Sequence, residues 1–344
     1  MRRTHYLAAA AAAAVLAAPP ARAAPSLRLV PDRLRPGDLV LVAAEGVAAP
    51  PEARVAGRPV RFFAVAGGFL GLAPLPIDLE PGPLEVEGRA GPDGPLLRAR
   101  AEVVPPGFTE TRLTVAPRYV TPSPAQRRRM EADQAAFDAA FSVPFGPPSF
   151  AARFAPPRED EVTAPYGQRR VFNGRQQGQH HGVDVAGAVG DTVLASNDGR
   201  VVLARDCYAS GRSVVVSHGA GLFTVYFHLS RMDVRAGDEV RRGQVIGRVG
   251  KTGRVTGPHL HFGVKVGGLY VDPDSVYRLD LGPDALSAPA RPAPPPAPPA
   301  GAAGSTGSPR RSSPRGASGP RRRSRPPRRP PRGRAGSRAP RPRA

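Results

Sequence analysis

The sequence predicts an all-β protein in which a helix joins two β-sheet domains. Over residues 26–118, strand-length apolar runs alternate with turns rich in glycine and proline. Over residues 161–280, short valine-rich runs recur between closely spaced glycines. Closely spaced short strands of this kind are typical of antiparallel sheets. We therefore expect an immunoglobulin-like β-sandwich at residues 26–118 and a second antiparallel β-sheet domain at residues 158–284.

The first domain has the patterns of β-strands but no cluster of residues typical of a catalytic or metal-binding site. One apolar run, Asp38–Val42, follows Pro36-Gly37, and further runs occupy residues 60–65, 84–88 and 98–103. The domain contains no histidine, and its carboxylates are scattered along the sequence. We therefore expect it to be an accessory domain without a catalytic site.

Residues 123–157 are predicted to form a connecting helix and a proline-rich linker. Ser123 can cap the helix, with Pro124 at its first position. Met130, Phe137 and Phe141 follow at spacings of seven and four residues, which places them on one helix face. This face is expected to pack on a neighbouring element.

Both ends of the chain are predicted to lie outside the folded domains. Arg2 and Arg3, an apolar stretch at residues 7–18 and the small-residue pattern Ala21-Arg22-Ala23 are typical of an export signal over residues 1–23. The apolar stretch is too short for a permanent membrane anchor. Residues 285–344 are rich in proline and arginine without periodicity, so this basic tail is predicted to be disordered.

The formal net charge of +21 is concentrated in the tail, which holds 15 arginines and no acidic residue. The rest of the chain is only mildly basic, and export argues against a nucleic-acid partner. Two interpretations of the tail stay open: accumulation of these residues in a disordered terminus, or tethering to anionic polymers of the cell envelope. Cys207 is the single cysteine and excludes an intrachain disulfide, so we expect it to be structural.

Six of the seven histidines lie between residues 180 and 261, which indicates a site in the second domain. On an extended strand His180, Gly182 and Asp184 point to one side, and the glycine is expected to leave space for an ion. In a second strand His259 and His261 share a face. If the two strands are neighbours, two imidazoles and a carboxylate converge, a set typical of catalytic zinc sites.

A third segment supplies another histidine. In the run from Thr224 to Ser230, alternation places Thr224, Tyr226 and His228 on one face, opposite Val225, Phe227 and Leu229. His228 is thus expected to reach the same groove. Whether Tyr226 contacts substrate stays open.

Three ordered motifs resemble the lysostaphin-type family of zinc endopeptidases. They are His180-x-Gly-x-Asp184, Tyr226-Phe-His228-Leu-Ser, and the run from Gly250 to Phe262 that contains His259-Leu-His261. The resemblance covers residues 160–275. It implies that His180, Asp184 and His261 bind zinc, that His228 and His259 are catalytic, and that the fold is a sheet assembly of the barrel-sandwich type with a narrow groove.

The resemblance also implies peptidoglycan peptides as substrates. From the export signal we expect a location in the periplasm, cell envelope or extracellular space. A zinc ion would activate a water molecule, and without a His-Glu-x-x-His motif the proton handling falls to His228 and His259. His181 and His218 are expected to be non-ligands. The alternative is a non-catalytic protein on the same scaffold that binds the wall or regulates hydrolases.

Overall fold

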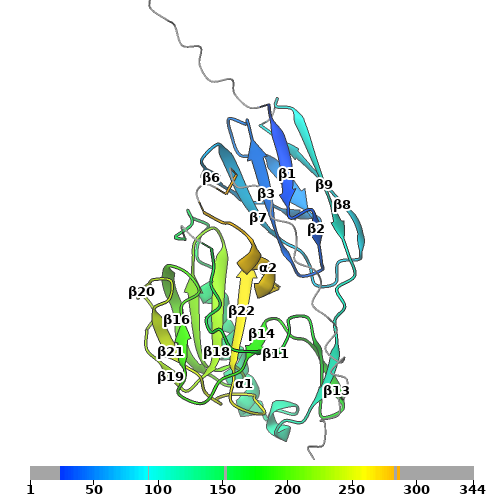
Figure 1. Ribbon diagram of the computed structural model, residues 1–344. Helices are drawn as coiled ribbons and strands as arrows, with labels where there is room; N and C mark the ends of the chain where they lie inside the picture. The colour runs from blue at the N-terminus through cyan, green and yellow to red at the C-terminus, as the bar shows by residue number, and fades with distance from the viewer. Residues whose placement is uncertain (1–23, 92, 151–152, 283–284, 287–344) are drawn as a thin grey trace, which may run out of the picture. The chain divides into compact units, whose positions relative to one another are not determined.

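The computed structural model describes residues 24–91, 93–150, 153–282 and 285–286, and these residues form mainly β-strands (Figure 1). The predicted all-β class is therefore confirmed. The predicted export signal at residues 1–23 lies outside the described residues, as does the predicted disorder of all but two residues of the tail.

Two sheets form the N-terminal domain. One has the order β1 (Ser26–Val30), β3 (Leu39–Glu45), β7 (Gly68–Pro74) and β6 (Phe62–Val65), and the other has the order β2 (Arg33–Leu34), β9 (Leu96–Val103), β8 (Gly82–Arg89), β4 (Glu52–Val55) and β5 (Arg58–Pro59). Side chains of both sheets, such as Val40 and Val86, belong to one buried apolar cluster. The immunoglobulin-like type of this domain stays a prediction.

An antiparallel sheet of eight strands forms the centre of the second domain. Its order is β11 (Val162–Ala164), β14 (Val183–Val185), β22 (Leu260–Val266), β18 (Leu222–Leu229), β17 (Gly211–Ser217), β16 (Gly199–Cys207) and β20 (Glu239–Val240), with β23 (Leu269–Val271) beside β22. Leu260 and Phe262 point into the main apolar core, as the alternation predicts. The described strands do not close into a barrel.

Two three-stranded sheets and a short helix flank the central sheet. The first sheet contains β15 (Thr192–Leu194), β21 (Val245–Arg248) and β19 (Arg231–Met232). The second contains β10 (Glu110–Leu113), β12 (Arg169–Phe172) and β13 (Arg175–Gln179), in which β10 runs parallel to β12. The helix α2 (Pro273–Arg278) follows β23, and a 3₁₀ turn at Pro117–Tyr119 precedes the long helix.

The predicted helix is present as α1 (Pro124–Phe141), and Ser123 forms a capping box with Gln126. Phe137 and Phe141 pack against Phe227 and Phe223 of β18, with ring centroids 5.6 and 5.3 Å apart. The predicted packing is wrong for Met130, which is 37% exposed. At that end of the helix a polar contact replaces apolar packing, because the buried Asp133 pairs with Arg205 of β16.

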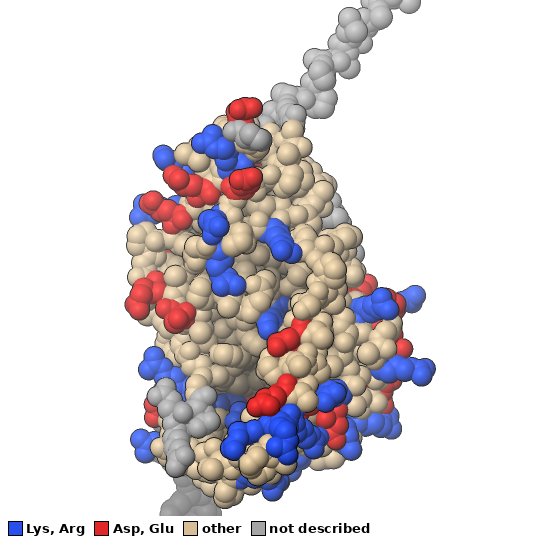
Figure 2. All heavy atoms as spheres, turned by 180° about the vertical axis from the view of Figure 1, so that it is seen from behind, with Lys and Arg blue, Asp and Glu red and all other residues tan. Residues whose placement is uncertain are grey.

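Charges of both signs are interspersed over the face shown in Figure 2, with basic side chains gathered at its lower end. The described part thus carries charges of both signs, whereas the tail carries positive charges without acidic residues. Among the described residues, no helix has the length and apolar character needed to cross a membrane.

A buried polar chain lies behind the central sheet and includes His218, one of the histidines expected to be non-ligands. Its Nδ1 donates to the carbonyl of Asp198 at 2.6 Å, and its Nε2 lies 2.8 Å from the Thr224 hydroxyl. Tyr226 continues the chain, since its Oη lies 3.0 Å from Thr224 and accepts from the Ser196 amide. Burial lowers the pKa of His218 to about 4, so the imidazole is neutral.

This histidine makes the stability of the fold sensitive to acid. The unfolded chain binds a proton at His218 near its ordinary pKa of about 6.5, whereas the folded chain does so only near pH 4. Above pH 6.5 this group therefore does not reduce the free energy of unfolding. As the pH drops from 6.5 towards 4, the free energy of unfolding falls by about 1.4 kcal/mol per pH unit for this one group. Urea unfolding between pH 7 and 4 should show a shallower slope for His218→Asn. An unchanged slope would contradict this assignment.

Candidate metal centre

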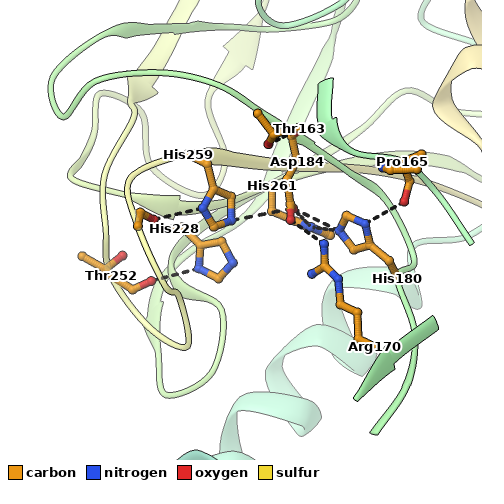
Figure 3. Close-up of polar contacts among 10 residues, drawn as sticks. Thr163, Pro165, Arg170, His180, Asp184, His228, Thr252, His259 and His261 are labelled. Atoms are coloured by element: carbon orange, nitrogen blue, oxygen red, sulfur yellow. Dashed lines mark hydrogen bonds and ion pairs between the residues drawn. The ribbon is translucent and has the colours of Figure 1, made fainter. Parts of the chain in front are cut away.

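Direct strand pairing brings the central donor atoms together. Asp184 of β14 lies opposite His261 of β22 in the antiparallel register, and His261 Nδ1 lies 2.9 Å from Asp184 Oδ1. His180 lies between β13 and β14, and its Nε2 is 2.9 Å from His261 Nδ1 and 3.0 Å from Asp184 Oδ1 (Figure 3). The neighbouring strands expected from the sequence are therefore present. In the described part of the chain this is the one group of three or more donors close enough to hold a metal ion.

The chemistry of these three atoms fits a cation. His180 Nδ1 donates to the carbonyl of Pro165 at 2.9 Å, which fixes its proton there and leaves the Nε2 lone pair directed at the other two donors. Tetrahedral zinc with bonds of about 2.0–2.1 Å would hold its ligand atoms roughly 3.3 Å apart. The three atoms would need to separate by only a few tenths of an ångström to accept such an ion.

Gly182 is required by the close packing of His261. A Cβ at this position would lie 2.8 Å from Cε1 and Nε2 of the His261 ring and would also collide with the carbonyl oxygen of Phe262. The sequence-based expectation that Gly182 leaves space for the ion itself is wrong. The space that the glycine provides is occupied by the ring of His261, whose Nδ1 belongs to the donor group.

Arg170 of β12 holds the second oxygen of Asp184. Its Nη2 lies 2.5 Å from Asp184 Oδ2, and the two side chains are 16% and 9% exposed. Burial raises the pKa of Asp184, but the close ring nitrogens of His180 and His261 outweigh burial and hold this pKa far below its usual value. Asp184 is therefore ionised, with Oδ1 directed at the donor group and Oδ2 at the arginine. Nothing in the spacing of the sequence marks Arg170 for this position.

His228 reaches the centre through an unusual backbone conformation. Its φ is +64°, in the left-handed region that costs a bulky residue of order 1–3 kcal/mol. Its Nδ1 donates to the carbonyl of Thr252 at 2.9 Å. Burial lowers the pKa of His228 to about 3, and the neighbouring His261 and His259 contribute to this shift.

The alternation predicted for this strand is therefore wrong at His228. Thr224 and Tyr226 point into the core, where Tyr226 is fully buried and offers no exposed surface to a substrate. Phe227 instead lies on the side of the metal centre, opposite His261 in the register, and their rings stack with centroids 5.3 Å apart. The left-handed turn at His228 returns this residue to the same side as Phe227.

His259 completes the group of five predicted site residues. Its Nδ1 donates to the carbonyl of Gly257 at 3.0 Å, and its Nε2 lies 3.7 Å from Asp184 Oδ1. The rings of His228 and His259 have centroids 5.0 Å apart. Burial lowers the pKa of His259 as well. Both histidines are therefore neutral near pH 7, and backbone carbonyls fix their protons on Nδ1.

The two histidines expected to be non-ligands lie outside the donor group. The exposed His181 stacks on Tyr270, with ring centroids 5.7 Å apart. His218 belongs to the buried polar chain behind the sheet. The structure thus brings together the five residues selected from the sequence and separates them from His181 and His218.

A largely buried His/Asp/His donor set beside two neutral histidines is the arrangement expected of a metal site of the hydrolase type. Residues 178–273 match the model of peptidase family M23, and this part of the chain belongs to that family. The family predicted from the three motifs is therefore confirmed.

Three of the known proteins that are similar to the chain illustrate the match. The peptidoglycan DD-endopeptidase ShyA of Vibrio cholerae is 48% identical over 89 residues, which cover 26% of this chain and 21% of ShyA. The DD-carboxypeptidase/endopeptidase Mpg of Neisseria meningitidis is 39% identical over 115 residues, covering 33% of this chain and 26% of Mpg. A crystal structure assigned to peptidase M23 from Pseudomonas aeruginosa aligns with a TM-score of 0.54 at 29% identity, over 70% of this chain and 94% of that one.

The chain thus spans about a quarter of the length of these two curated relatives. Their names describe whole proteins that contain much besides the shared domain. The activity and substrate of this chain are therefore argued from its own site below.

Metal content tests the donor group directly. The purified chain should retain about one divalent ion after dialysis, whereas His180→Ala and Asp184→Asn should retain almost none, because each removes one of three converging donors. His181→Ala is the matched control, since it changes the adjacent histidine, which lies outside the group, and it should bind metal like the wild type. Elemental analysis of the dialysed proteins gives the answer. Full metal retention in Asp184→Asn would contradict the assignment.

Proposed function

We propose that this chain is an exported zinc endopeptidase that hydrolyses peptide cross-links of bacterial peptidoglycan. The observation that carries the proposal is the convergence of His180, Asp184 and His261 beside the neutral His228 and His259. The names of the relatives ShyA and Mpg support the peptidoglycan substrate. The pattern of residues 1–23 supports export.

The donor set favours zinc as the ion. Two imidazole nitrogens and one carboxylate oxygen are ligands that catalytic zinc sites use, whereas magnesium and calcium prefer oxygen ligands alone. When bound, zinc supplies a Lewis acid that polarises the scissile carbonyl and makes a water molecule acidic near neutral pH. Arg170 neutralises and orients Asp184 from behind, as outer partners of metal ligands commonly do.

His228 and His259 are assigned the proton transfers. Because the carbonyls of Thr252 and Gly257 hold their Nδ1 protons, each ring has an unprotonated Nε2. Such a nitrogen accepts a proton from the attacking water and can then donate it to the leaving amine. The imidazolium of His228 is disfavoured by burial, so a proton that it accepts is readily passed on. The two histidines are not ranked.

A non-catalytic protein that binds the wall or regulates hydrolases is the alternative on this scaffold. Such a protein needs neither a complete donor set nor neutral histidines beside it. All five positions are filled here and lie together, which favours catalysis. The basic tail is proposed to contact anionic envelope polymers, a role that adds to hydrolysis and does not replace it.

Digestion of purified peptidoglycan tests the proposal. The wild-type chain should release fragments with new amine termini, and removal of metal by a chelator should abolish the release. A protein that binds the wall without cutting it would support the alternative. Neither binding nor cleavage would point to a peptidase that acts on other proteins.

The two histidines give a sharper test. His228→Ala and His259→Ala should each retain metal yet lose about 100- to 10,000-fold in the rate of hydrolysis, because each removes a general acid-base group. His181→Ala serves as the control and should keep its rate within a few-fold of the wild type. Wild-type rates in both His228→Ala and His259→Ala would contradict the assigned proton transfers.

A further inference from the structure

Two arginines meet at the edge of the metal centre without enough acidic partners to satisfy them. Arg170 contacts Asp184 through Nη2 alone, and its buried Nε has no hydrogen-bond acceptor among the described residues. The second, Arg254, lies in the segment between Gly250 and His259. In the described part of the chain it forms neither an ion pair nor a side-chain hydrogen bond.

Arg254 is held in place by an aromatic ring. Its guanidinium lies over the ring of Phe172, with 4.7 Å between Cζ and the ring centroid. Its backbone amide donates to the carbonyl of Ala209 at 2.7 Å. The side chain is only partly exposed, yet its nitrogen atoms are not among the buried unpaired atoms and so remain accessible to a ligand. Arg254 is thus a fixed cation whose hydrogen-bond donors are free.

The strand β12 places this cation beside the metal centre. Residues two apart on a strand share a face, so Arg170 and Phe172 project to the same side of β12, about 7 Å apart. Arg254, over Phe172, therefore lies next to Arg170, which itself contacts Asp184. On the other flank, the carbonyl of Thr252 holds His228, two residues from Arg254 along the chain. Burial lowers the pKa of Arg254, and repulsion from Arg170 adds to this shift, which is consistent with this proximity.

We propose that Arg254, with Arg170 beside it, forms a carboxylate-binding subsite that selects peptides bearing a free carboxylate close to the scissile bond. The inference rests on the proposed peptidase function and specifies its substrate. A guanidinium presents paired N–H donors that match a carboxylate, and partial burial strengthens such a pair. Arg170 already shares its charge with Asp184, so Arg254 is the specificity-determining residue and Arg170 is a positioning residue.

The occupant follows from where the two arginines lie. A carboxylate beside them would be within a few bonds of a peptide group at the metal centre. Two kinds of peptide offer such a group: one that ends at the residue after the scissile bond, and a cross-linked one whose next residue is joined through its side chain. An internal residue of an ordinary linear peptide has no free α-carboxylate.

A pair of peptides that differ in one group tests the subsite without hydrolysis. N-acetyl-D-alanyl-D-alanine and its C-terminal amide are titrated into the metal-stripped full chain, which binds but does not cut. The wild type should bind the acid about tenfold more tightly than the amide, and Arg254→Gln should bind both equally. Arg254→Lys should keep part of the preference, because lysine keeps the positive charge but lacks the paired N–H donors of the guanidinium.

The matched control is Arg112→Gln, which removes an exposed arginine on the neighbouring strand β10. It should retain the full preference for the acid. The ratio of the two affinities reports on the subsite alone, because general damage to the fold weakens both ligands equally. A wild type without preference, or a preference that persists in Arg254→Gln, would overturn the proposal.

Hydrolysis by the metal-loaded chain separates this proposal from the proposed function. Binding that prefers the acid, without hydrolysis of any peptide or of peptidoglycan, would retain the subsite and refute the peptidase. Hydrolysis at equal kcat/KM for matched acid and amide substrates would retain the peptidase and refute the subsite. Loss of the preference in kcat/KM by Arg254→Gln, with unchanged metal content, is the result expected if both are right.

Discussion

The pairing of β14 with β22 is the constraint on which the metal centre depends. It sets Asp184 directly opposite His261, so two of three donors are positioned by backbone hydrogen bonds rather than by flexible loops. Their approach needs Gly182, because any side chain there would meet the His261 ring. A shift of one residue in this register would move His261 to the core side and destroy the site.

Around this pairing, backbone carbonyls determine which ring nitrogen of three histidines carries the proton. Three different segments present a carbonyl to Nδ1 of His180, His228 and His259, so each ring has its Nε2 free. The same local geometry therefore leaves one unprotonated nitrogen on each ring, one for the proposed metal and two for the proposed proton transfers. Of these three rings, only that of His180 approaches Asp184 Oδ1 closely, at 3.0 Å, whereas His259 Nε2 lies 3.7 Å from it.

The sequence was sufficient for the fold class, the capped helix and the convergence of the five predicted site residues, because these depend on local alternation, capping residues and the spacing of the motifs. It was insufficient where the backbone departs from the regular strand. Alternation assigned Tyr226 and His228 to one face, and the left-handed residue at His228 breaks that rule. Arg170 was missed because its partner, Asp184, is brought close only by the tertiary fold. Likewise the ring of His261, rather than an ion, fills the space beside Gly182.

The positive charge of Arg170 has two opposing effects on the groups of the metal centre. Arg170 stabilises the ionised Asp184, yet its charge also disfavours the protonated forms of His259 and His261. Arg254 adds a second positive charge beside Arg170, and neither an acidic side chain nor a side-chain hydrogen bond in the described residues compensates it. A fold gains nothing in stability from placing two guanidinium groups side by side. Such an arrangement becomes favourable once an anion binds beside them, and this is the reason for proposing a carboxylate of the substrate as the missing partner.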